Sequence, residues 1–219
     1  MGLNSVTCGI LNWGPHYWDR FSKTLLESLA ACDPQPDRII IATDRPLDGL
    51  PDNIEQIESN QRFLGLNLIA AHTDTTWVFN VGLDDTLPGD AFAGIEGDED
   101  CIGFACRQSG ETNAIARPPH PDEYRAAWRL DHNPMNGGYF YRCSSLVQVP
   151  FRDYIYADEV FFAEWSYFGL TYRQTDKVRI NWFRWQGSNS WPANREGEQQ
   201  AREFKHRLRE GKILKGIPE

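Results

Sequence analysis

Apolar and polar residues alternate in blocks over the first half of the chain, as they do where strands and helices follow one another. Short apolar runs predict buried strands at 6–11, 38–44, 54–57 and 77–81. Between these runs, apolar residues recur at helical spacing over 17–32 and 63–71. This order predicts an α/β fold with a mixed, mostly parallel sheet whose strands are joined by crossover helices.

The second half has a different character. Two further strands are predicted at 101–107 and 139–143, and the Pro-rich stretch between them has room for a short helix over 121–130. A helix is predicted over 158–170, opening on two acids and closing at a glycine. We therefore divide the chain into 1–107, a polar insertion at 108–134, a second half at 135–190 and a basic C-terminal helix or tail at 191–219. The insertion is either a lid on the acceptor side of a site or a surface excursion without a role.

Charge is spread unevenly along the 219 residues, whose net charge is −9. Residues 1–170 hold 11 Lys/Arg against 25 Asp/Glu, whereas residues 171–219 hold 11 against 6. The acidic majority argues against a general nucleic-acid binder, because such binding depends on cations that neutralise phosphates. The basic end is either a local patch for an anionic partner or the solvated face of a C-terminal helix.

The cysteines and the apolar runs indicate the cellular compartment of the protein. Five cysteines without a CxxC pair indicate buried, reduced thiols. The sequence has no basic-then-apolar leader and no apolar run near 18 residues. We therefore expect a soluble, cytoplasmic protein with no membrane partner.

Two adjacent carboxylates are the most informative feature of the chain. Asp84 and Asp85 come directly after the apolar run at 77–81, and Asp44 ends the run at 38–44. Carboxyl ends of parallel strands meet at one edge of a sheet, where α/β proteins bind their ligands. Carboxylates at such an edge suit a hard divalent cation, which often takes one or two protein ligands plus the oxygens of a diphosphate.

Three segments, taken in order, carry a resemblance to a known family. Residues 61–71 contain Arg62 and Asn67, residues 77–91 run from a strand through the acids to Leu-Pro-Gly-Asp-Ala, and Asp158-Glu159 opens the later helix. Together they resemble the GT-A glycosyltransferases, most closely the inverting enzymes of glycosyltransferase family 2, over about residues 4–190. The resemblance implies a Rossmann-like GT-A sheet with flanking helices and a C-terminal extension on the acceptor side.

The resemblance also implies an activity, a cofactor and roles for named residues. The expected reaction moves a sugar from a nucleoside-diphosphate sugar, with a UDP-sugar the favoured donor, to a hydroxyl group with inversion. Asp84 and Asp85 would bind Mn²⁺ or Mg²⁺, and Asp158 or Glu159 would be the base. In this picture 1–107 binds the donor and 135–190 carries the acceptor and the base. The implied nucleotide-sugar contacts are Leu11, Asn12, Trp13, Asp44, Arg62, Asn67, Asp84 and Arg184.

The chain also departs from the family pattern. Gly82 stands where the first acid of the family's Asp-x-Asp motif would be. The acidic pair reads Asp158-Glu159 rather than Glu-Asp, so position favours Glu159 as the base and residue type favours Asp158. Where many relatives place a histidine, this chain has residues 181–187, in which the resemblance implies that Arg184 would supply a positive charge instead.

Three hypotheses are left open, two for the acceptor of a transferase and one for a protein of another class. The first is a glycan or small-molecule hydroxyl. The second is a hydroxymethylated base in DNA, as in phage-type DNA modification, which would place the protein in the host cytoplasm. It is motivated by aromatic and cationic residues near the end of the chain: Trp182, Arg184, Trp185, Trp191, Arg195, Arg202, Lys205, Arg207 and Arg209. The third is a nucleotide-sugar-binding module without turnover, motivated by Gly82 and the missing histidine.

Overall fold

The protein is built around one continuous twisted sheet. The computed structural model describes residues 5–12, 17–59, 64–109, 114–130, 132, 134, 137–183 and 195–215. Within these residues the strand order is β3-β2-β1-β4-β7-β5-β6, and β8 pairs with β5 outside that path. Four of the strand pairings are parallel and three are antiparallel. The mixed, mostly parallel α/β class predicted from the sequence is confirmed.

The first half of the chain forms the parallel part of the sheet. Its elements are β1 (Val6–Asn12), α1 (Tyr17–Ala30), β2 (Arg38–Thr43), β3 (Ile54–Glu58), α2 (Leu64–His72) and β4 (Trp77–Gly82). Every strand and helix predicted here is present, with ends that shift by one or two residues. Apolar runs make β1, β2 and β4 visible in the sequence, because a strand covered by helices on both faces is apolar on both.

The second half adds the antiparallel part and differs from prediction in three elements. It contains β5 (Cys101–Ser109), β6 (Ile115–Ala116), α3 (Pro121–Ala126), β7 (Gly138–Arg142), α4 (Cys143–Gln148), α5 (Ala157–Tyr167), β8 (Tyr172–Phe183) and α6 (Arg195–Arg209). The predictions missed β6, α4 and the 12-residue β8, and Cys143 opens a helix instead of ending a strand. Most residues of β8 are partly buried or exposed, with only Arg179 and Ile180 buried, so the strand lacks the apolar run that reveals the others.

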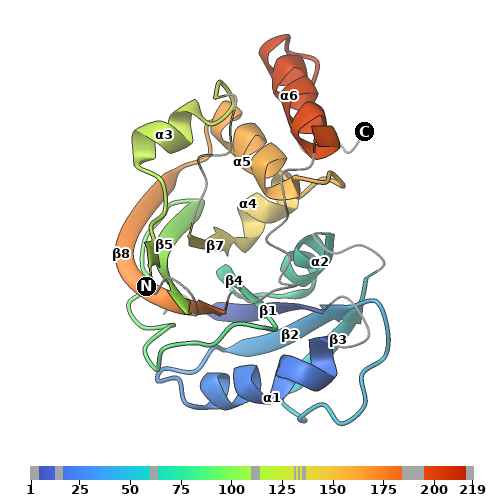
Figure 1. Cartoon of the computed structure of the whole chain (residues 1–219), viewed down its shortest axis with the longest axis vertical. Helices are drawn as coiled ribbons and strands as arrows, with labels where there is room; N and C mark the ends of the chain where they lie inside the picture. Colours follow the sequence, from blue (N-terminus) through green and yellow to red (C-terminus); the bar gives the residue numbers. More distant parts are fainter. Residues whose placement is uncertain are drawn as a thin grey trace.

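Helices cover both faces of the sheet and extend beyond one of them (Figure 1). On one face α1 packs over Cys8, Ile10 and Phe79 in a core that includes the apolar residues following β4. On the other face α2, α4 and α5 pack over Val78 and the tyrosines of β7. A third, smaller core joins α5 to α6. The C-terminal helix is thus separated from the sheet by α5.

The predicted insertion at 108–134 belongs largely to the body of the fold. Its first two residues continue β5, and β6 pairs with the same strand. α3 contacts α5 and β8, and the buried Tyr124 hydroxyl donates to the Leu170 carbonyl at 3.0 Å. A capping box of His120 and Glu123 begins α3, with Pro121 in its first turn. A role for this segment at an acceptor site stays a prediction.

The five cysteines are buried and unpaired, as expected. Among the described residues, no helix combines the length and the apolar character needed to cross a membrane.

Candidate functional site

Three parallel strands end together at one edge of the sheet. Leu11 of β1 lies opposite Ala42 of β2 and Gly82 of β4, and Asn12 lies opposite Thr43. The residues that follow β2 and β4 therefore begin at the same edge, as the sequence predicted for Asp44 and Asp84. In α/β proteins this carboxyl edge is where ligands bind.

The two carboxylates after β4 fold back over the end of the strand. A Cβ atom at Gly82 would lie 2.9 Å from Oδ2 of Asp85 and 3.1 Å from Oδ1 of Asp84, closer than a methyl group and an oxygen can approach without displacing each other. The missing side chain at Gly82 therefore makes room for both acids. Since side chains alternate along a strand, that space is on the face shared by Val78 and Asn80.

Asp85 is held in a desolvated environment. The side chain is 9% exposed, and its oxygens accept backbone N–H groups from Gly82 at 3.3 Å and from Phe183 of β8 at 3.2 Å. Burial, and then the negative charge of Asp84, raise the pKa of Asp85 to about 8. Two backbone hydrogen bonds only partly compensate for the loss of water and the neighbouring charge. This is a pair of acids to which a bound cation would bring a large electrostatic gain.

Asp158, in the first turn of α5, lies on the same face of the sheet. Burial raises the pKa of Tyr139 and of Tyr141 well above the usual value, and the nearby Asp158 carboxylate contributes to both shifts. Both tyrosines belong to β7, and Tyr141 lies opposite Val78 of β4. Because opposite residues in an antiparallel pair share a face, Asp158 and the space over Gly82 are on one side of the sheet.

Glu159 points elsewhere. Its Oε1 accepts a hydrogen bond from Nζ of Lys205 on α6 at 2.6 Å, and the two side chains are 10% and 1% exposed. The two acids diverge, as expected for neighbours on a helix. Neither acid occupies the N-cap of α5, which is Tyr156 and makes no side-chain capping hydrogen bond. Of the two candidate bases, Asp158 is the one whose surroundings are on the sheet side.

The predicted nucleotide contacts on β1 and β2 are arranged at the carboxyl edge. Asn12 is buried and donates through Nδ2 to Thr43 Oγ1 at 3.0 Å, while its Oδ1 has no hydrogen-bond partner among the described residues. Leu11 packs partly buried against the core on the α2 and α5 face. Asp44 pairs with the adjacent Arg45 at 3.0 Å and is partly exposed.

Asn67 has a structural role that the sequence did not suggest. Its Nδ2 donates to the Phe151 carbonyl and its Oδ1 accepts the Phe151 N–H, both at 2.8 Å. The amide therefore ties α2 to the segment before α5, and a contact with nucleotide stays a prediction. Trp13, Arg62 and Arg184 lie outside the described residues.

Asn80 is a polar residue that the sequence analysis overlooked. It lies in the middle of β4 on the Val78 face, and its Oδ1 is buried without a partner among the described residues. Asn181 of β8, whose backbone pairs with Thr86, has a similarly unpartnered Oδ1 within the described part of the chain. Buried polar atoms normally find a partner, so such atoms are candidates for contacts with a ligand or water. An asparagine inside an apolar run was the signal available in the sequence.

The acids fit a cation that is bound only in part by protein. No cluster of three or more His, Cys, Asp or Glu side chains suited to a metal exists in the part of the chain that the structure describes. Asp84 and Asp85 supply two carboxylates, of which Asp85 is buried and Asp84 is partly buried. Mg²⁺ and Mn²⁺ suit such oxygen ligands and would complete their shells with diphosphate oxygens and water.

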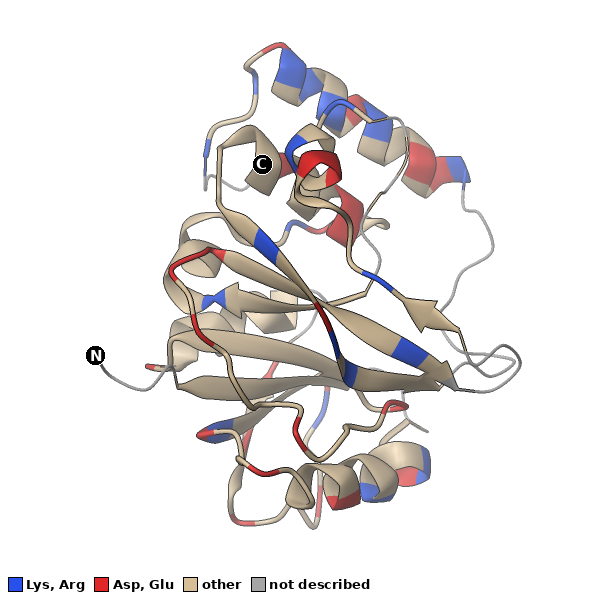
Figure 2. Ribbon diagram, turned by 90° about the vertical axis from the view of Figure 1, so that its left-hand side faces the viewer, with Lys and Arg blue, Asp and Glu red and all other residues tan. Residues whose placement is uncertain are grey.

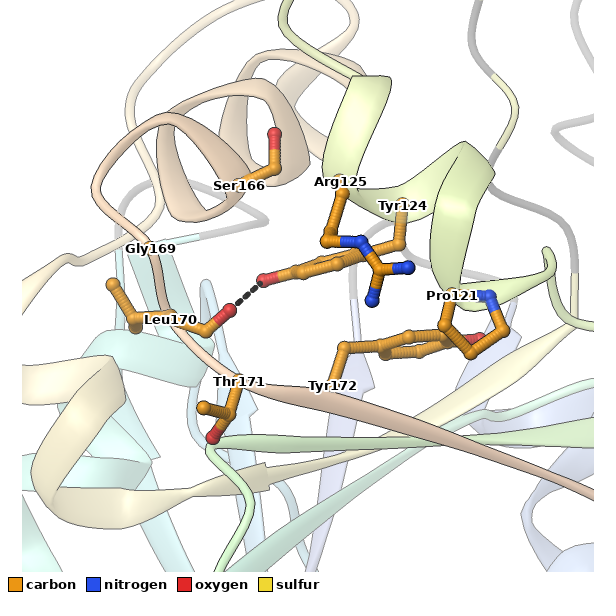
Figure 3. A pocket seen from close by; sticks show the side chains of 8 residues that line it. All are labelled: Pro121, Tyr124, Arg125, Ser166, Gly169, Leu170, Thr171 and Tyr172. Carbon is orange, nitrogen blue, oxygen red and sulfur yellow. Dashed lines mark hydrogen bonds between the residues drawn. The ribbon is translucent and has the colours of Figure 1, made fainter.

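A separate pocket of about 350 Å³ lies at the other end of α5 (Figure 3). Tyr124 and Tyr172 stack there with ring centroids 4.5 Å apart, and Arg125 extends over the pair from α3. The pocket includes Ser166 and Gly169, whereas Asp158 is at the start of the same helix, roughly 15 Å away by the rise per residue. None of the predicted site residues lines this pocket.

The basic C-terminal helix is neutralised in part within the fold. Acidic residues lie toward the start of α6 and basic residues toward its end (Figure 2). Arg202 pairs with Glu198 at 3.2 Å, and Lys205 is buried with Glu159. Trp182 packs against the core of the sheet. Lys205 therefore leaves the set of residues predicted to contact DNA, while Trp185 and Trp191 lie outside the described residues.

Solved structures with a similar architecture include a complex with UDP-GlcNAc and a CTP transferase. The chain is similar to S. aureus TarS, with 13% identity and a TM-score of 0.60 over 82% of this chain and 37% of TarS. It is similar to TarS 1-349 in complex with UDP-GlcNAc, with 16% identity and a TM-score of 0.65 over 97% of this chain and 68% of that one. It is also similar to the inositol-1-phosphate CTP transferase from T. maritima, with 12% identity and a TM-score of 0.54 over 97% and 99%.

These likenesses establish the fold. No protein-family model and no curated protein matches the chain. At identities of 12–16%, the structural matches show a shared Rossmann-type α/β architecture, which agrees with the fold expected from the sequence. The chain spans little more than a third of the full TarS chain, 37%.

Proposed function

We propose that this protein transfers a sugar from a nucleoside-diphosphate sugar to an acceptor hydroxyl group. The observation that carries the proposal is that two sets of acids lie on one face of the sheet: the Asp84–Asp85 pair over Gly82 at the carboxyl edge, and Asp158 near Tyr139 and Tyr141. A similar fold has been solved with UDP-GlcNAc and with UDP, which makes a UDP-sugar the favoured donor. TarS itself is a longer chain, so its complexes with UDP-GlcNAc and UDP support the proposed donor only.

In the proposed reaction the acceptor oxygen attacks the anomeric carbon as the bond from that carbon to the diphosphate breaks. The acceptor proton passes to Asp158, and the nucleoside diphosphate leaves with the electron pair. A single displacement of this kind inverts the anomeric centre. Asp158 is placed at a helix N-terminus, which favours its ionised, proton-accepting form.

Asp84 and Asp85 would hold the divalent cation, Mn²⁺ or Mg²⁺. When bound, the cation supplies charge neutralisation for the leaving diphosphate. Asp85 already accepts two backbone N–H groups. We therefore assign direct ligation first to Asp84, with Asp85 fixing the turn and adding negative charge.

The nucleotide would lie along the ends of β1 and β2. Asn12 Oδ1 is a buried acceptor without a partner among the described residues, and Asp44 is a carboxylate at the same edge. These groups suit the N–H of a base and the hydroxyl groups of a ribose. Leu11, Trp13, Arg62 and Arg184 complete the proposed contacts.

One of the similar structures is a CTP transferase for inositol-1-phosphate, so chemistry must decide between two reactions. A phosphate nucleophile is already deprotonated and needs no base, whereas a hydroxyl nucleophile does. Asp158 would have no function in the first reaction and has one in the second. This favours sugar transfer over nucleotidyl transfer.

The acceptor is proposed to be a glycan or small-molecule hydroxyl. The alternative, a hydroxymethylated base in DNA, rests on cations near the end of the chain, and the structure directs Lys205 into the interior. Salt-sensitive retention of hydroxymethylcytosine DNA that weakens when Arg202 and Arg207 become Ala would favour the DNA acceptor. Equal retention of both proteins would count against it.

A donor screen tests the proposed function. The protein is incubated with UDP-, GDP- and other nucleotide sugars and Mn²⁺, and release of nucleoside diphosphate is followed with mass spectrometry of acceptor products. We expect slow hydrolysis of at least one donor and loss of the Mn²⁺-stimulated part in Asp84→Ala. Tight donor binding without release across the whole panel would instead support a binding module without turnover.

The base is tested by comparing two isosteric variants. Asp158→Asn should lower turnover by about 10²–10⁴-fold, the usual contribution of a positioned base. Glu159→Gln should retain more activity, because Glu159 is engaged by Lys205. Near-normal rates in both variants would remove α5 from the chemistry.

A further inference from the structure

Lys205 is a buried cation at the junction of three segments. Its Nζ donates to Glu159 Oε1 at 2.6 Å, to the Leu130 carbonyl at 2.8 Å and to the His132 carbonyl at 3.3 Å. The side chain is 1% exposed. An ammonium group has three N–H donors, and here each is directed to an acceptor from α5 or from the segment that follows α3.

The surroundings make this an unusual place for a charge. The other buried side chains on this face of α6 are Ala201, Phe204 and Leu208, which pack with Val160 and Ala163 of α5. An apolar residue at position 205 would continue that face. Replacing a buried ion pair with apolar residues often leaves stability unchanged or increases it, so stability alone is a weak reason for Lys205 and Glu159.

We propose that Lys205 is a positioning residue for the catalytic helix. By holding Glu159, it fixes the first turn of α5 and with it the adjacent Asp158. By holding the carbonyls of Leu130 and His132, it fixes the same turn relative to the predicted acceptor-side segment. This inference rests on the proposed function. It gives α6 a role in positioning the catalytic base, although α6 is separated from the sheet by α5.

A catalytic base acts only over a narrow range of distances from its substrate. A base must be within hydrogen-bond reach of the acceptor hydroxyl, and a displacement of about 1 Å can cost on the order of 10²-fold in rate. Without Lys205, the Glu159 carboxylate would be left in a largely buried position next to Asp158. It would then move toward water and would take the first turn of α5 with it.

The test uses the full chain and four variants: Lys205→Met, Glu159→Gln, the double variant, and Lys212→Met as a control. Lys212 pairs with Glu210 at 2.8 Å and is 63% exposed, so its loss removes the same charge from the surface. Each protein is assayed for turnover (kcat and KM) with the best donor of the screen, for UDP affinity by calorimetry, and for Tm. Assays are run at a temperature well below the lowest Tm.

We expect kcat to fall by about 10- to 100-fold in Lys205→Met, while the Kd for UDP changes by less than about twofold. The double variant should recover part of the lost kcat, because it leaves no uncompensated carboxylate beside Asp158. Lys212→Met should match the wild type. If Lys205→Met fails to fold, Glu159→Gln carries the test, with a kcat loss at unchanged UDP affinity expected.

Two outcomes overturn the inference in distinguishable ways. A Lys205→Met or Glu159→Gln protein with a lower Tm but wild-type kcat would show that the pair is structural only. A wild-type protein that turns over no donor would remove the proposed function, and the role of Lys205 with it.

Discussion

Gly82 illustrates how one residue without a side chain organises the edge of the sheet. The family that the sequence resembles has an acid at this position, and here the space is taken by the carboxylates of Asp84 and Asp85. Those oxygens lie so close to the glycine that a methyl group would displace them. The acid pair and Gly82 therefore form a structural unit.

Gly82→Ala tests this unit. The added methyl group would meet carboxylate oxygens rather than backbone, and Asp85 would lose part of its backbone hydrogen bonding as it moved, so we expect a loss of about 1–2 kcal/mol in the free energy of unfolding. Turnover stimulated by Mn²⁺ should fall markedly, because the acids must move. Gly89→Ala, whose Cβ would have only one ordinary contact at 3.5 Å, is the control. Unchanged metal stimulation in Gly82→Ala would contradict this role.

The pH dependence of Asp85 gives a second prediction. Its pKa is raised from 3.8 to about 8 in the folded protein, so the unfolded chain loses this proton at lower pH than the folded chain. Without metal, this group's contribution to stability is greatest below about pH 4 and is lost as the pH rises toward 8. Metal binding must displace the proton, so the increase in Tm caused by Mn²⁺ should grow with pH up to about 8.

Thermal unfolding with EDTA or Mn²⁺ across the range from mildly acidic to mildly basic pH measures this effect. The pH dependence of the Mn²⁺-induced shift in Tm should be flattened in Asp85→Asn, which has no proton to release. A shift that is equally large at all pH values in the wild type would show that Asp85 does not titrate with the metal.

At the scale of elements, the helices of one face are joined by specific polar contacts as well as by apolar packing. Asn67 of α2 binds the backbone of Phe151 through both ends of its amide. Phe151 stacks on Phe161 of α5 with ring centroids 3.8 Å apart. α2, the segment before α5 and α5 itself are therefore linked into one unit.

Asn67→Ala should weaken this unit. Two backbone groups of Phe151 would lose their partners, and we expect a loss of about 1–3 kcal/mol in the free energy of unfolding, measured with urea. Affinity for UDP should be unchanged. The neighbouring Leu68→Ala, at a position 42% exposed, is the control and should change stability by less than about 0.5 kcal/mol. Weaker UDP binding at unchanged stability would favour the nucleotide contact predicted from the sequence.

At the scale of the whole molecule, a second buried ion pair joins the C-terminal region to the body. Arg152 binds Glu164 of α5 through two hydrogen bonds of 2.7 Å, and the side chains are 6% and 0% exposed. The same guanidinium lies over the ring of Phe204 on α6 and donates to the Leu214 carbonyl at 3.4 Å. The acidic body and the basic end of the chain thus meet in the interior.

Arg152→Met should be strongly destabilising. It would leave Glu164 buried without its cation, and we expect a loss of about 3–5 kcal/mol in urea unfolding followed by circular dichroism. The double variant Arg152→Met/Glu164→Leu should be more stable than the single one. Lys23→Met is the control, because it breaks the Lys23–Glu27 pair on α1, which is exposed and should contribute little. A loss below about 1 kcal/mol in Arg152→Met would contradict the prediction.

Strand and helix order in the first half was predictable because burial on both faces makes β1, β2 and β4 continuously apolar. β8 was not predictable in the same way, since it pairs only with β5 among the described strands and many of its residues reach solvent. The acids after β4 were found from the sequence because they interrupt an apolar run. Asn80 was overlooked because a single amide inside such a run acquires meaning only when its oxygen is seen to lack a partner within the described structure.

The sequence by itself determined the α/β class, the edge at which Asp44 and Asp84 follow their strands, and the presence of two acids at the start of α5. Only the tertiary structure decided what those acids contact. Periodicity records which side of an element is buried, whereas the partner of a side chain depends on segments far away in the chain. Lys205, 46 residues after Glu159, binds that acid and leaves Asp158 on the sheet side.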